Sequence, residues 1–519
     1  MKLIELCLTM AYDYKVNYTD VYSQVRCWDT LIYNHLKKKH IVVPPREDQE
    51  KATQYEGAYV KDPDLGLHKW IVSFDLNSLY PHLIMQYNIS PETYYDVKTN
   101  GVNVDNMLSQ QVNLKFAKDK NITIAPNGAM FRRDKQGFLP ELMEKMYGDR
   151  VVYKKKMIEA KKEYEKTKDP IYKNEIARCH NIQMAKKIAL NSAYGAIGNQ
   201  YFRYFDVKQA EAITLGGQLS IRWVERDVNK FMNKVLETNN QNYVVASDTD
   251  SIYISMGKLV DKVCKNKTPQ QISDFLDKVS EQKLQKIIDK SFDNLADYVN
   301  AFEQKMVMKR EAIANKGIWV AKKRYMLNLF DEEGIRYEYP KLKVMGVEAV
   351  KSSTPEICRT KIKEAIRVIM NESEDDLIKY VADFKETFKT LSPEEVAFPR
   401  SCNNIMKFAD SSSIYKKGTP IHVKGALIYN YHLHKHKLEM KYPVIKDGDK
   451  IKFLMLKIPN NIKDTVISFS SKIPYEFDLH KYVDYDLQFQ KTFTDPLKFI
   501  LDSIGWKLER EATLEAFFG

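Results

Sequence analysis

The chain has 519 residues, with 81 Lys or Arg against 69 Asp or Glu, which gives a formal net charge of +12. This length allows two to four domains of about 150 residues each, and the basic excess suits a polyanionic partner, although a chromatin-type binder or a membrane-surface protein would share it. The six cysteines form no CxxC pair and no apolar run approaches a membrane helix in length, which argues against a zinc ribbon, a disulfide framework and a membrane-spanning protein, and favours a soluble cytoplasmic one.

The first sixty residues predict helix followed by loop. Met1 to about Leu36 has a helical pattern, and the acidic triplet Asp48-Gln49-Glu50 is assigned to a polar loop. In YEGAYV, residues 55–60, Gly57 permits a close approach of the backbone to a partner, although a plain turn has the same composition.

An apolar strand is predicted from Ile71 into Asp75, within IVSFDLNSLYPHL, and a turn or helix start is predicted at Asn77 and Ser78. Asp75 therefore lies at a strand end, where its carboxylate can join a metal site. A helix N-cap is the structural alternative for this residue.

Two long charged helices are predicted between about Gly137 and Asn199, and Lys168-Asp169-Pro170 interrupts them, so this segment is expected to be a helical hairpin. On each helix, polar residues recur at helical spacing and therefore share one face of that helix. The first helix carries Arg150 and Lys154, and the second carries Lys187, Asn191 and Tyr194. Cations fixed on helices neutralise a triphosphate well, whereas the alternative for each basic pair is a solvated helix face.

A β-hairpin is predicted for YVVASDTDSIYIS, residues 243–255, with SDTD as its turn. Because residues two apart on an extended chain face the same way, Asp248 and Asp250 are expected to point together and to need a cation between them. Oxygen ligands favour Mg²⁺ or Mn²⁺. With Asp75 they could hold two ions about 4 Å apart, an arrangement suited to phosphoryl transfer; a capped hairpin turn is the alternative.

The second half of the chain predicts a helix through Leu284 to Val307 and then basic strands. At the end of the sequence, ATLEAFFG puts Leu514, Phe517 and Phe518 on one side of a helical turn. Exposed aromatic residues at a terminus are unusual, and one structural explanation is that this segment folds back onto the chain.

Three strings, DLNSLYP, KKIALNSAYG and SDTDS, occur in this order and resemble motifs A, B and C of the family B DNA polymerases. FPRSCNNIMKF, IYKKGTPIHVKGALIYN, KKRYMLN and PKLKVMGVEAVKSSTP extend the resemblance, which is strongest to the replicative enzymes of T-even-like bacteriophages and covers nearly the whole chain.

The resemblance implies an α+β fold with the right-hand polymerase architecture: an antiparallel-sheet palm, two-helix fingers and a mostly helical thumb. The expected boundaries are a helical linker at 1–46 following a missing exonuclease domain, palm at 47–136 and 200–355, fingers at 137–199, and thumb at 356–519. It also implies that proofreading resides on a separate polypeptide or is absent.

The resemblance further implies roles for individual residues in primer extension with deoxynucleoside triphosphates and two Mg²⁺ ions, for which Mn²⁺ can substitute. Asp75 and Asp250 bridge the metals with Asp248 assisting, the backbone of Leu76, Ser78 and Leu79 holds the metal-bound triphosphate, and Tyr80 excludes a ribose 2′ hydroxyl. Lys187 is placed to protonate the departing pyrophosphate, and the helical hairpin can swing to close Arg150, Lys154 and Lys187 on a correctly paired nucleotide.

Primer-template DNA is the expected polyanion. The residues expected along it are Gly57, Lys322, Lys323, Arg324, Tyr325, Lys341, Lys343 and Lys351. The terminal Leu514, Phe517 and Phe518 resemble the peptide by which such polymerases bind a ring-shaped sliding clamp.

Two departures from the family pattern concern residues close to the expected metals. Ala246-Ser247 precedes the metal pair where Gly is usual at the second position, and Lys309 stands where close relatives carry an acidic residue, which leaves a third-carboxylate role to Glu311 alone. A silent DNA-binding scaffold, a primed RNA polymerase and a reverse transcriptase are the competing functions.

Overall fold

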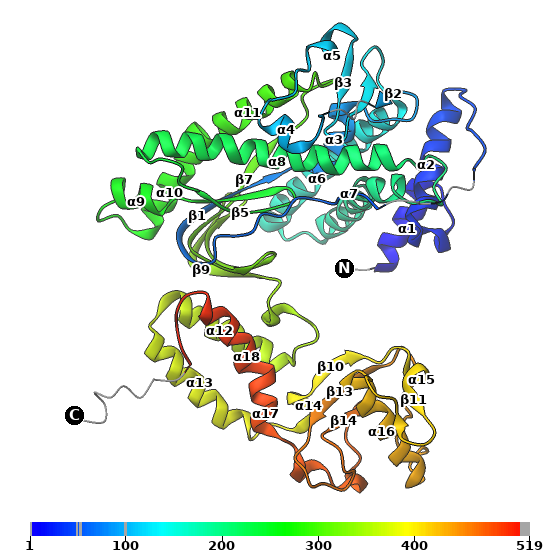
Figure 1. The fold of residues 1–519 in the computed structure, drawn as a ribbon, viewed down its shortest axis with the longest axis vertical. Helices are drawn as coiled ribbons and strands as arrows, with labels where there is room; N and C mark the ends of the chain where they lie inside the picture. The colour runs from blue at the N-terminus through cyan, green and yellow to red at the C-terminus, as the bar shows by residue number, and fades with distance from the viewer. Residues whose placement is uncertain (1–2, 48–49, 51–53, 98–100, 509–519) are drawn as a thin grey trace. The chain divides into compact units, whose positions relative to one another are not determined.

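The computed structural model describes residues 3–47, 50, 54–97 and 101–508 (Figure 1). The chain divides into two compact units. One comprises Met1–Asp62, Val72–Ile313 and Glu332–Gly334, and the other comprises Pro63–Ile71, Ala314–Asp331 and Ile335–Gly519. The fold combines helices with antiparallel strand pairs, as the sequence predicts.

The largest sheet has six strands in the order β5-β6-β1-β7-β8-β9. Its strands are β1 Gly66–Leu76, β5 Val244–Asp248, β6 Ser251–Ser255, β7 Met308–Ala321, β8 Arg324–Glu332 and β9 Ile335–Met345. The predicted strand at 71–75 is therefore the second half of β1, and the predicted hairpin is the antiparallel pair of β5 and β6.

Helices account for most of the first unit. They are α1 Leu3–Tyr14, α2 Gln24–Lys38, α3 Leu79–Tyr87, α4 Val104–Leu108, α5 Lys115–Asp119, α6 Phe138–Thr167, α7 Pro170–Ile197, α8 Val207–Leu236, α9 Gly257–Val263, α10 Pro269–Val279 and α11 Gln285–Tyr298. A small sheet, β2-β4-β3, adds β2 Tyr94–Val97, β3 Ile122–Ile124 and β4 Ala129–Arg132. The 3₁₀ turn η1 Tyr18–Tyr22 joins α1 to α2, and the π turn η2 Ser280–Leu284 leads into α11.

The paired helices α6 and α7 confirm the predicted helical hairpin, including the place where it is interrupted (Figure 1). Lys168 adopts the left-handed conformation after α6, and Asp169 accepts a hydrogen bond from the Ile171 amide at 2.9 Å as the N-cap of α7. Pro170 occupies the first helical position, where its missing N–H costs no hydrogen bond.

The amino-terminal helices hold the second half of α7 by hydrogen bonds to two buried backbone carbonyls and to one serine hydroxyl. The Tyr14 hydroxyl donates to the Ala185 carbonyl, and the Trp28 indole N–H donates to the Ala189 carbonyl at 3.1 Å and to Ser192 Oγ at 3.1 Å. The helical character expected for the start of the chain is confirmed for residues 3–36, as two helices separated by η1.

The second unit contains helices and two further sheets. Its helices are α12 Glu356–Asn371, α13 Glu374–Phe388, α14 Pro393–Val396, α15 Ile405–Phe408, α16 Ile421–Lys435, α17 Tyr485–Phe489 and α18 Asp495–Asp502, with shorter turns η3 Glu348–Val350, η4 Tyr475–Phe477, η5 His480–Tyr482 and η6 Gln490–Thr494. The sheets are β10-β13-β14, formed by Phe398–Ser401, Lys450–Met455 and Val466–Phe469, and β11-β12, formed by Ala409–Asp410 and Ile414–Tyr415.

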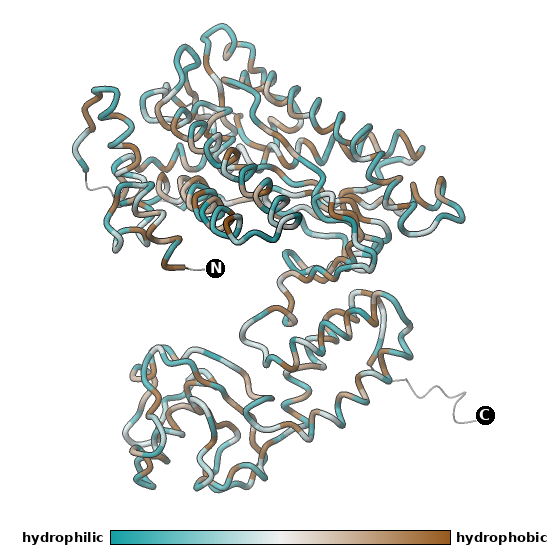
Figure 2. Tube along the Cα trace, turned by 180° about the vertical axis from the view of Figure 1, so that it is seen from behind, coloured by the Kyte–Doolittle hydropathy of each residue, from teal (hydrophilic) through white to brown (hydrophobic). Residues whose placement is uncertain are grey.

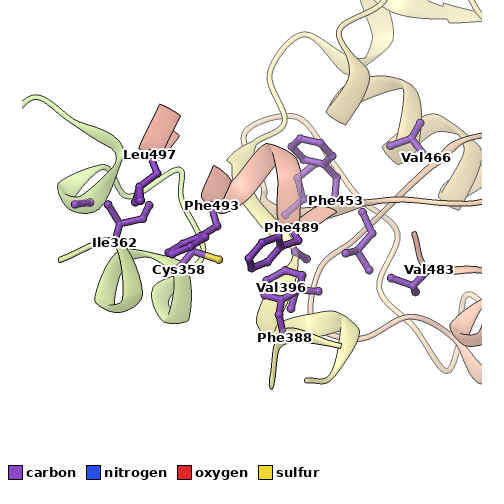
Figure 3. Packing of buried hydrophobic residues seen from close by; sticks show 14 of the residues in the cluster. Cys358, Ile362, Phe388, Val396, Phe453, Val466, Val483, Phe489, Phe493 and Leu497 are labelled. Atoms are coloured by element: carbon purple, nitrogen blue, oxygen red, sulfur yellow. The ribbon is translucent and has the colours of Figure 1, made fainter. Parts of the chain in front are cut away.

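A hydrophobic core fills this unit, and aromatic rings on α13, α17 and η6 lie at its centre (Figure 3). The Phe388 and Phe489 rings are 5.2 Å apart and perpendicular, and the Phe384 and Phe493 rings are 4.8 Å apart. Cys358 packs beside these rings as a buried free thiol (Figure 3). The other five cysteines are also free and buried, at other places in the chain.

Three details differ from the expectations or lie beyond the described residues. The helix expected through Leu284 to Val307 ends at Tyr298, and a loop leads into β7. The segment after Pro355 contains a three-stranded sheet besides its helices. Leu514, Phe517 and Phe518 lie outside the described residues.

Among the described residues, no helix has the length and apolar character needed to cross a bilayer. The long helices instead mix hydrophilic and hydrophobic residues along their length (Figure 2).

Candidate active site

The junction between β1 and α3 brings segments distant in sequence together. The Leu76 amide donates to the Asp250 carbonyl at 2.8 Å, and the Asn77 amide donates to the Val307 carbonyl at 3.1 Å. Ser78 then takes a left-handed conformation with φ 49° before α3 begins. Asp75 and Asp250 therefore lie on backbone segments joined by a hydrogen bond.

The β5–β6 turn differs in one respect from the extended chain assumed from the sequence. The strands end at Asp248 and resume at Ser251, so Asp250 lies in a two-residue turn with Thr249, whose φ is 60°. The Asp250 amide donates to the Asp248 carbonyl at 2.6 Å, and the Thr249 hydroxyl donates to the Asp248 carboxylate at 3.1 Å. The tight turn, and not the alternation of an extended strand, brings these two residues close.

The segment that contains Gly57 continues along the edge of β5. Val60 forms an antiparallel bridge with Asp248, and the Thr249 amide donates to the Tyr59 carbonyl at 3.0 Å. Gly57 itself is exposed, a Cβ added to it would meet no atom within 4 Å, and its carbonyl accepts from Gln218 Nε2 at 2.8 Å.

A cavity of about 840 Å³ opens beside Asp75 within the first unit. Cationic residues from α6 and from the start of β7 line it together with carboxylates and amides. The lining comprises Asp75, Asn77, Tyr147, Arg150, Val151, Lys154, Ser280, Glu281, Gln285, Asp289, Val307, Lys309, Arg310, Glu311, Glu333 and Gly334. Asp75, Arg150 and Lys154, which the sequence predicts at one site, all line this cavity.

Arg150 is the best-defined cation of the cavity. Its Nη1 donates to Ser78 Oγ at 3.0 Å, whereas its Nε is buried without a hydrogen-bond partner among the described residues. Burial lowers the pKa of the guanidinium, which still stays charged at neutral pH. A buried donor without a partner lowers stability. An anionic ligand that accepted a hydrogen bond from this N–H would therefore be bound favourably.

Aromatic side chains form the other part of the site. The Tyr80 and Tyr194 rings are 4.8 Å apart, and the Tyr55 and Tyr194 rings are 6.4 Å apart and perpendicular. Burial, followed by the hydrogen bond with Tyr55, raises the pKa of Tyr194, and burial, followed by the Asp250 charge, raises the pKa of Tyr80. Gly217 on α8 packs closely against the start of α3, since a Cβ there would lie 3.3 Å from Leu79 Cδ2.

Two adjacent lysines on α7 have different surroundings. Lys186 is buried, with its Nζ 3.2 Å from Asp13 and 3.4 Å from Asp149, whereas Lys187 is exposed. Asn191 is exposed on the same face as Lys187, and Tyr194 is half-buried. The expected shared face of these three residues is present, but none of them lines the cavity that contains Arg150.

The donor set fits hard divalent ions in its chemistry. Asp75, Asp248 and Asp250 offer carboxylate oxygens, and Leu76 offers a carbonyl oxygen, which are the ligands preferred by Mg²⁺ and Mn²⁺. Their backbones converge at the Leu76 to Asp250 hydrogen bond. Within the described residues, however, no three His, Cys, Asp or Glu side chains are already grouped as a metal site.

Comparison with known proteins identifies the family of this chain. The profile of the family described as DNA polymerase family B matches residues 16–504. The chain belongs to DNA polymerase family B.

Relatives within family B agree with this assignment. The DNA-directed DNA polymerases of Enterobacteria phage T4 and Escherichia phage RB69 are 32% and 33% identical, over 99% and 100% of this chain. DNA polymerase 1 of Pyrococcus abyssi is 28% identical over 88% of this chain and 48% of its own length. The chain spans 62% of the length of each phage relative.

The residues that the family B resemblance places along DNA lie in the second unit, apart from Gly57. Lys322 and Lys323 are exposed in the turn between β7 and β8, and Lys341 is exposed on β9. Gly346 passes so close to this turn that a Cβ would lie 2.1 Å from the Lys323 carbonyl oxygen, so only glycine fits there.

Other members of the expected DNA-binding set have partners inside the protein. Tyr325 is only 7% exposed and stacks on Trp319 at 5.7 Å. The Arg324 guanidinium lies 5.5 Å from the Phe499 ring, and Lys351 pairs with Glu348 at 2.7 Å. Lys343 on β9 is half-buried.

Several residues at the cavity and beside the tyrosines were not predicted from the sequence. Tyr147, Glu281 and Asp289 line the cavity, and Tyr55 contacts Tyr194. The helical spacing of Tyr147 and Arg150 on one face of α6 was the available signal for the first of these. Lys309 and Glu311 were noted from the sequence, and both line the cavity; Glu311 accepts a hydrogen bond from Ser73 Oγ at 3.2 Å.

Proposed function

We propose that this family B chain is a template-directed DNA polymerase that extends a primer 3′ hydroxyl with deoxynucleoside triphosphates. The observation that carries the proposal is the hydrogen bond from Leu76, the residue after Asp75, to Asp250, beside a cavity lined by Asp75, Arg150 and Lys154. Carboxylates next to fixed cations are what a metal-bound triphosphate requires.

In the proposed reaction, the primer 3′ oxygen attacks the α-phosphorus, its bond to that phosphorus forms, and the bond to the pyrophosphate oxygen breaks. Asp75 and Asp250, with Asp248 and the Leu76 carbonyl, would hold two Mg²⁺ ions, or Mn²⁺ in their place. When bound, such ions supply stabilisation of negative charge on the attacking and leaving oxygens.

The protein's own groups bind and orient the nucleotide. The backbone of Ser78 and Leu79 would bind the triphosphate, while Arg150, Lys154 and exposed Lys187 neutralise charge on the leaving pyrophosphate. Lys187 would donate the proton that the pyrophosphate takes up. Tyr80, packed against Tyr194, would fill the space of a ribose 2′ hydroxyl, and Asn191 would complete the nucleotide-binding face of α7.

The sequence-based subdivision fits this proposal. Residues 137–199 would be the fingers, the segments 47–136 and 200–355 the palm, and 356–519 the thumb, acting in the cytoplasm of an infected host cell. A sliding clamp bound through Leu514, Phe517 and Phe518 stays a prediction from the sequence.

The test is incorporation of a single deoxynucleotide on a defined primer-template with Mg²⁺, for the wild-type chain and for Asp250→Ala. We expect template-matched extension by the wild-type chain and a loss of about 1,000-fold or more in the variant, because the variant lacks a carboxylate proposed to hold the metal ions. DNA binding without extension by either protein would favour the silent scaffold. A preference for ribonucleotides or for an RNA template would favour an RNA polymerase or a reverse transcriptase.

A further inference from the structure

His82 is a buried histidine that the proposed mechanism does not use. It lies on α3, one turn after Ser78, and is 6% exposed. Its Nδ1 is 2.9 Å from the Ser78 carbonyl oxygen, and its backbone amide donates to the same oxygen at 3.2 Å. Because a carbonyl only accepts, Nδ1 must carry the proton.

The same imidazole contacts α6. Its ring lies 4.5 Å from the Tyr147 ring, at an interplanar angle of 85°. Tyr147 precedes Arg150 by three residues and so lies on the same face of α6. His82 therefore touches both the α3 start and the helix that carries the cavity's arginine.

Ser78 is held from two directions. Its φ of 49° is uncommon for a residue with a side chain and persists only where the surroundings fix it. His82 binds its carbonyl, and Arg150 binds its hydroxyl at 3.0 Å. Loss of either contact would free the turn that connects Asp75 to α3.

The surroundings of His82 keep it uncharged. Burial lowers its pKa, and the nearby cations Lys305 and Arg150 lower it further, against the opposing effect of the Ser78 carbonyl. Tyr147 is the titratable group whose ring contacts the imidazole from α6. A neutral ring protonated on Nδ1 is thus the form that fits the geometry.

We propose that His82 is a positioning residue that fixes the Ser78 turn and, through it, Arg150 in the arrangement that receives the triphosphate. The inference rests on the proposed polymerase function. His82 touches no substrate; it acts through Ser78 and through Tyr147 on α6.

Two substitutions separate the hydrogen bond from the packing. His82→Asn keeps an N–H donor close to the Nδ1 position, and His82→Phe keeps a ring against Tyr147 but removes the donor. For His82→Phe we expect the KM for the matched deoxynucleotide to rise about ten-fold, the equivalent of one hydrogen bond, with kcat within about two-fold. His82→Asn should restore a KM close to that of the wild-type chain.

His68 provides a matched control. Its Nε2 is 2.7 Å from the Asp64 carbonyl, also four residues earlier, and its ring lies edge-on to Trp319 at 5.7 Å. It does not line the cavity. His68→Phe should leave the KM unchanged. That result would show that loss of a hydrogen bond from a histidine to a backbone carbonyl does not by itself raise the KM.

A measurement without catalysis tests the inference separately from the proposed function. In ¹⁵N NMR of the full chain without nucleotide, the His82 resonance should report a neutral ring protonated on Nδ1. An Nε2-protonated or charged ring would overturn the inference, and so would equal KM values for His82→Phe and the wild-type chain, or equal KM increases for the Phe and Asn variants. A wild-type chain that incorporates no nucleotide would instead overturn the proposed function. The NMR measurement would still show whether His82 donates its Nδ1 proton to the Ser78 carbonyl.

Discussion

The junction of β1 with α3 has two neighbourhoods that are built in different ways. The cationic neighbourhood, formed by Arg150 and Lys154, depends on long side chains from α6 and on single polar contacts such as that of Arg150 with Ser78. The aromatic neighbourhood, formed by Tyr55, Tyr80 and Tyr194, consists of rings packed against one another.

The difference indicates what each neighbourhood can do. Packed rings define a fixed shape, which suits the discrimination of one sugar from another by exclusion. A long exposed side chain such as that of Lys154 can adjust to a ligand, which suits binding of a flexible triphosphate. The following substitutions test this division.

Replacement of Arg150 should have the largest effect. Arg150→Ala removes a charge-assisted contact to the triphosphate, and we expect kcat/KM for the matched deoxynucleotide to fall by about 100-fold or more, measured in single-nucleotide extension. Lys156 lies on the same helix but outside the cavity lining. In Lys156→Ala the kcat/KM should therefore fall by less than about two-fold. Equal losses in the two variants would show that the helix contributes only general charge.

Replacement of Tyr80 tests the aromatic neighbourhood. Tyr80→Ala opens the space beside Tyr194, and the ratio of deoxyribonucleotide to ribonucleotide kcat/KM should fall by about 100-fold, mainly through faster ribonucleotide incorporation. Tyr80→Phe keeps the ring and should keep the ratio. If the alanine variant still discriminates as the wild-type chain does, the ring is a core residue without a role in sugar choice.

The adjacent lysines on α7 separate function from folding. Lys187→Met should lower kcat by about ten-fold or more with little change in the unfolding midpoint, because the exposed amine is proposed to act on pyrophosphate. Lys186→Met leaves Asp13 and Asp149 without their cation and should lower the free energy of unfolding by about 1–3 kcal/mol, as measured with urea. The reverse pattern would exchange the roles assigned to the two residues.

The smallest expected effect is on the pH dependence of stability, through the ion pair between Glu144 on α6 and Lys305. The hydrogen bond from Lys305 at 2.7 Å, helped by one from Gln136, lowers the pKa of Glu144. A lowered pKa in the folded state means that the stabilisation is present above the unfolded value of 4.5 and is lost as the pH falls through the folded value. The thermal midpoint of the wild-type chain should therefore drop slightly more than that of Glu144→Gln between pH 6 and pH 3, since the variant lacks this carboxyl.

Much of the local structure followed from the sequence because its signals are local. The strand before Asp75, the hairpin around Thr249 and the helix break at Pro170 each depend on neighbouring residues: an apolar run, a polar turn and a residue that lacks an N–H. The ordered motifs identified the family, which the match over residues 16–504 establishes.

Features that depend on distant partners could not be predicted. Nothing in the sequence around Lys186 distinguishes it from Lys187, because its partners Asp13 and Asp149 lie on α1 and α6. The contact of His82 with Tyr147 and the pairing of β10 with β13 likewise join segments separated by dozens of residues. Short strands of this kind carry too little periodicity to be recognised alone.

The hydrogen bonds from Tyr14 and Trp28 to the α7 carbonyls restrict any motion of the helical hairpin. Since these bonds are buried, α7 cannot separate from α1 and α2 around residues 185–192 without exposing polar groups. A hinge for nucleotide capture would then fall nearer the Pro170 end of α7, or else α1 and α2 would travel with it. A fluorescent label on the exposed side of α1 distinguishes these cases, since only the second would change its signal when a nucleotide binds.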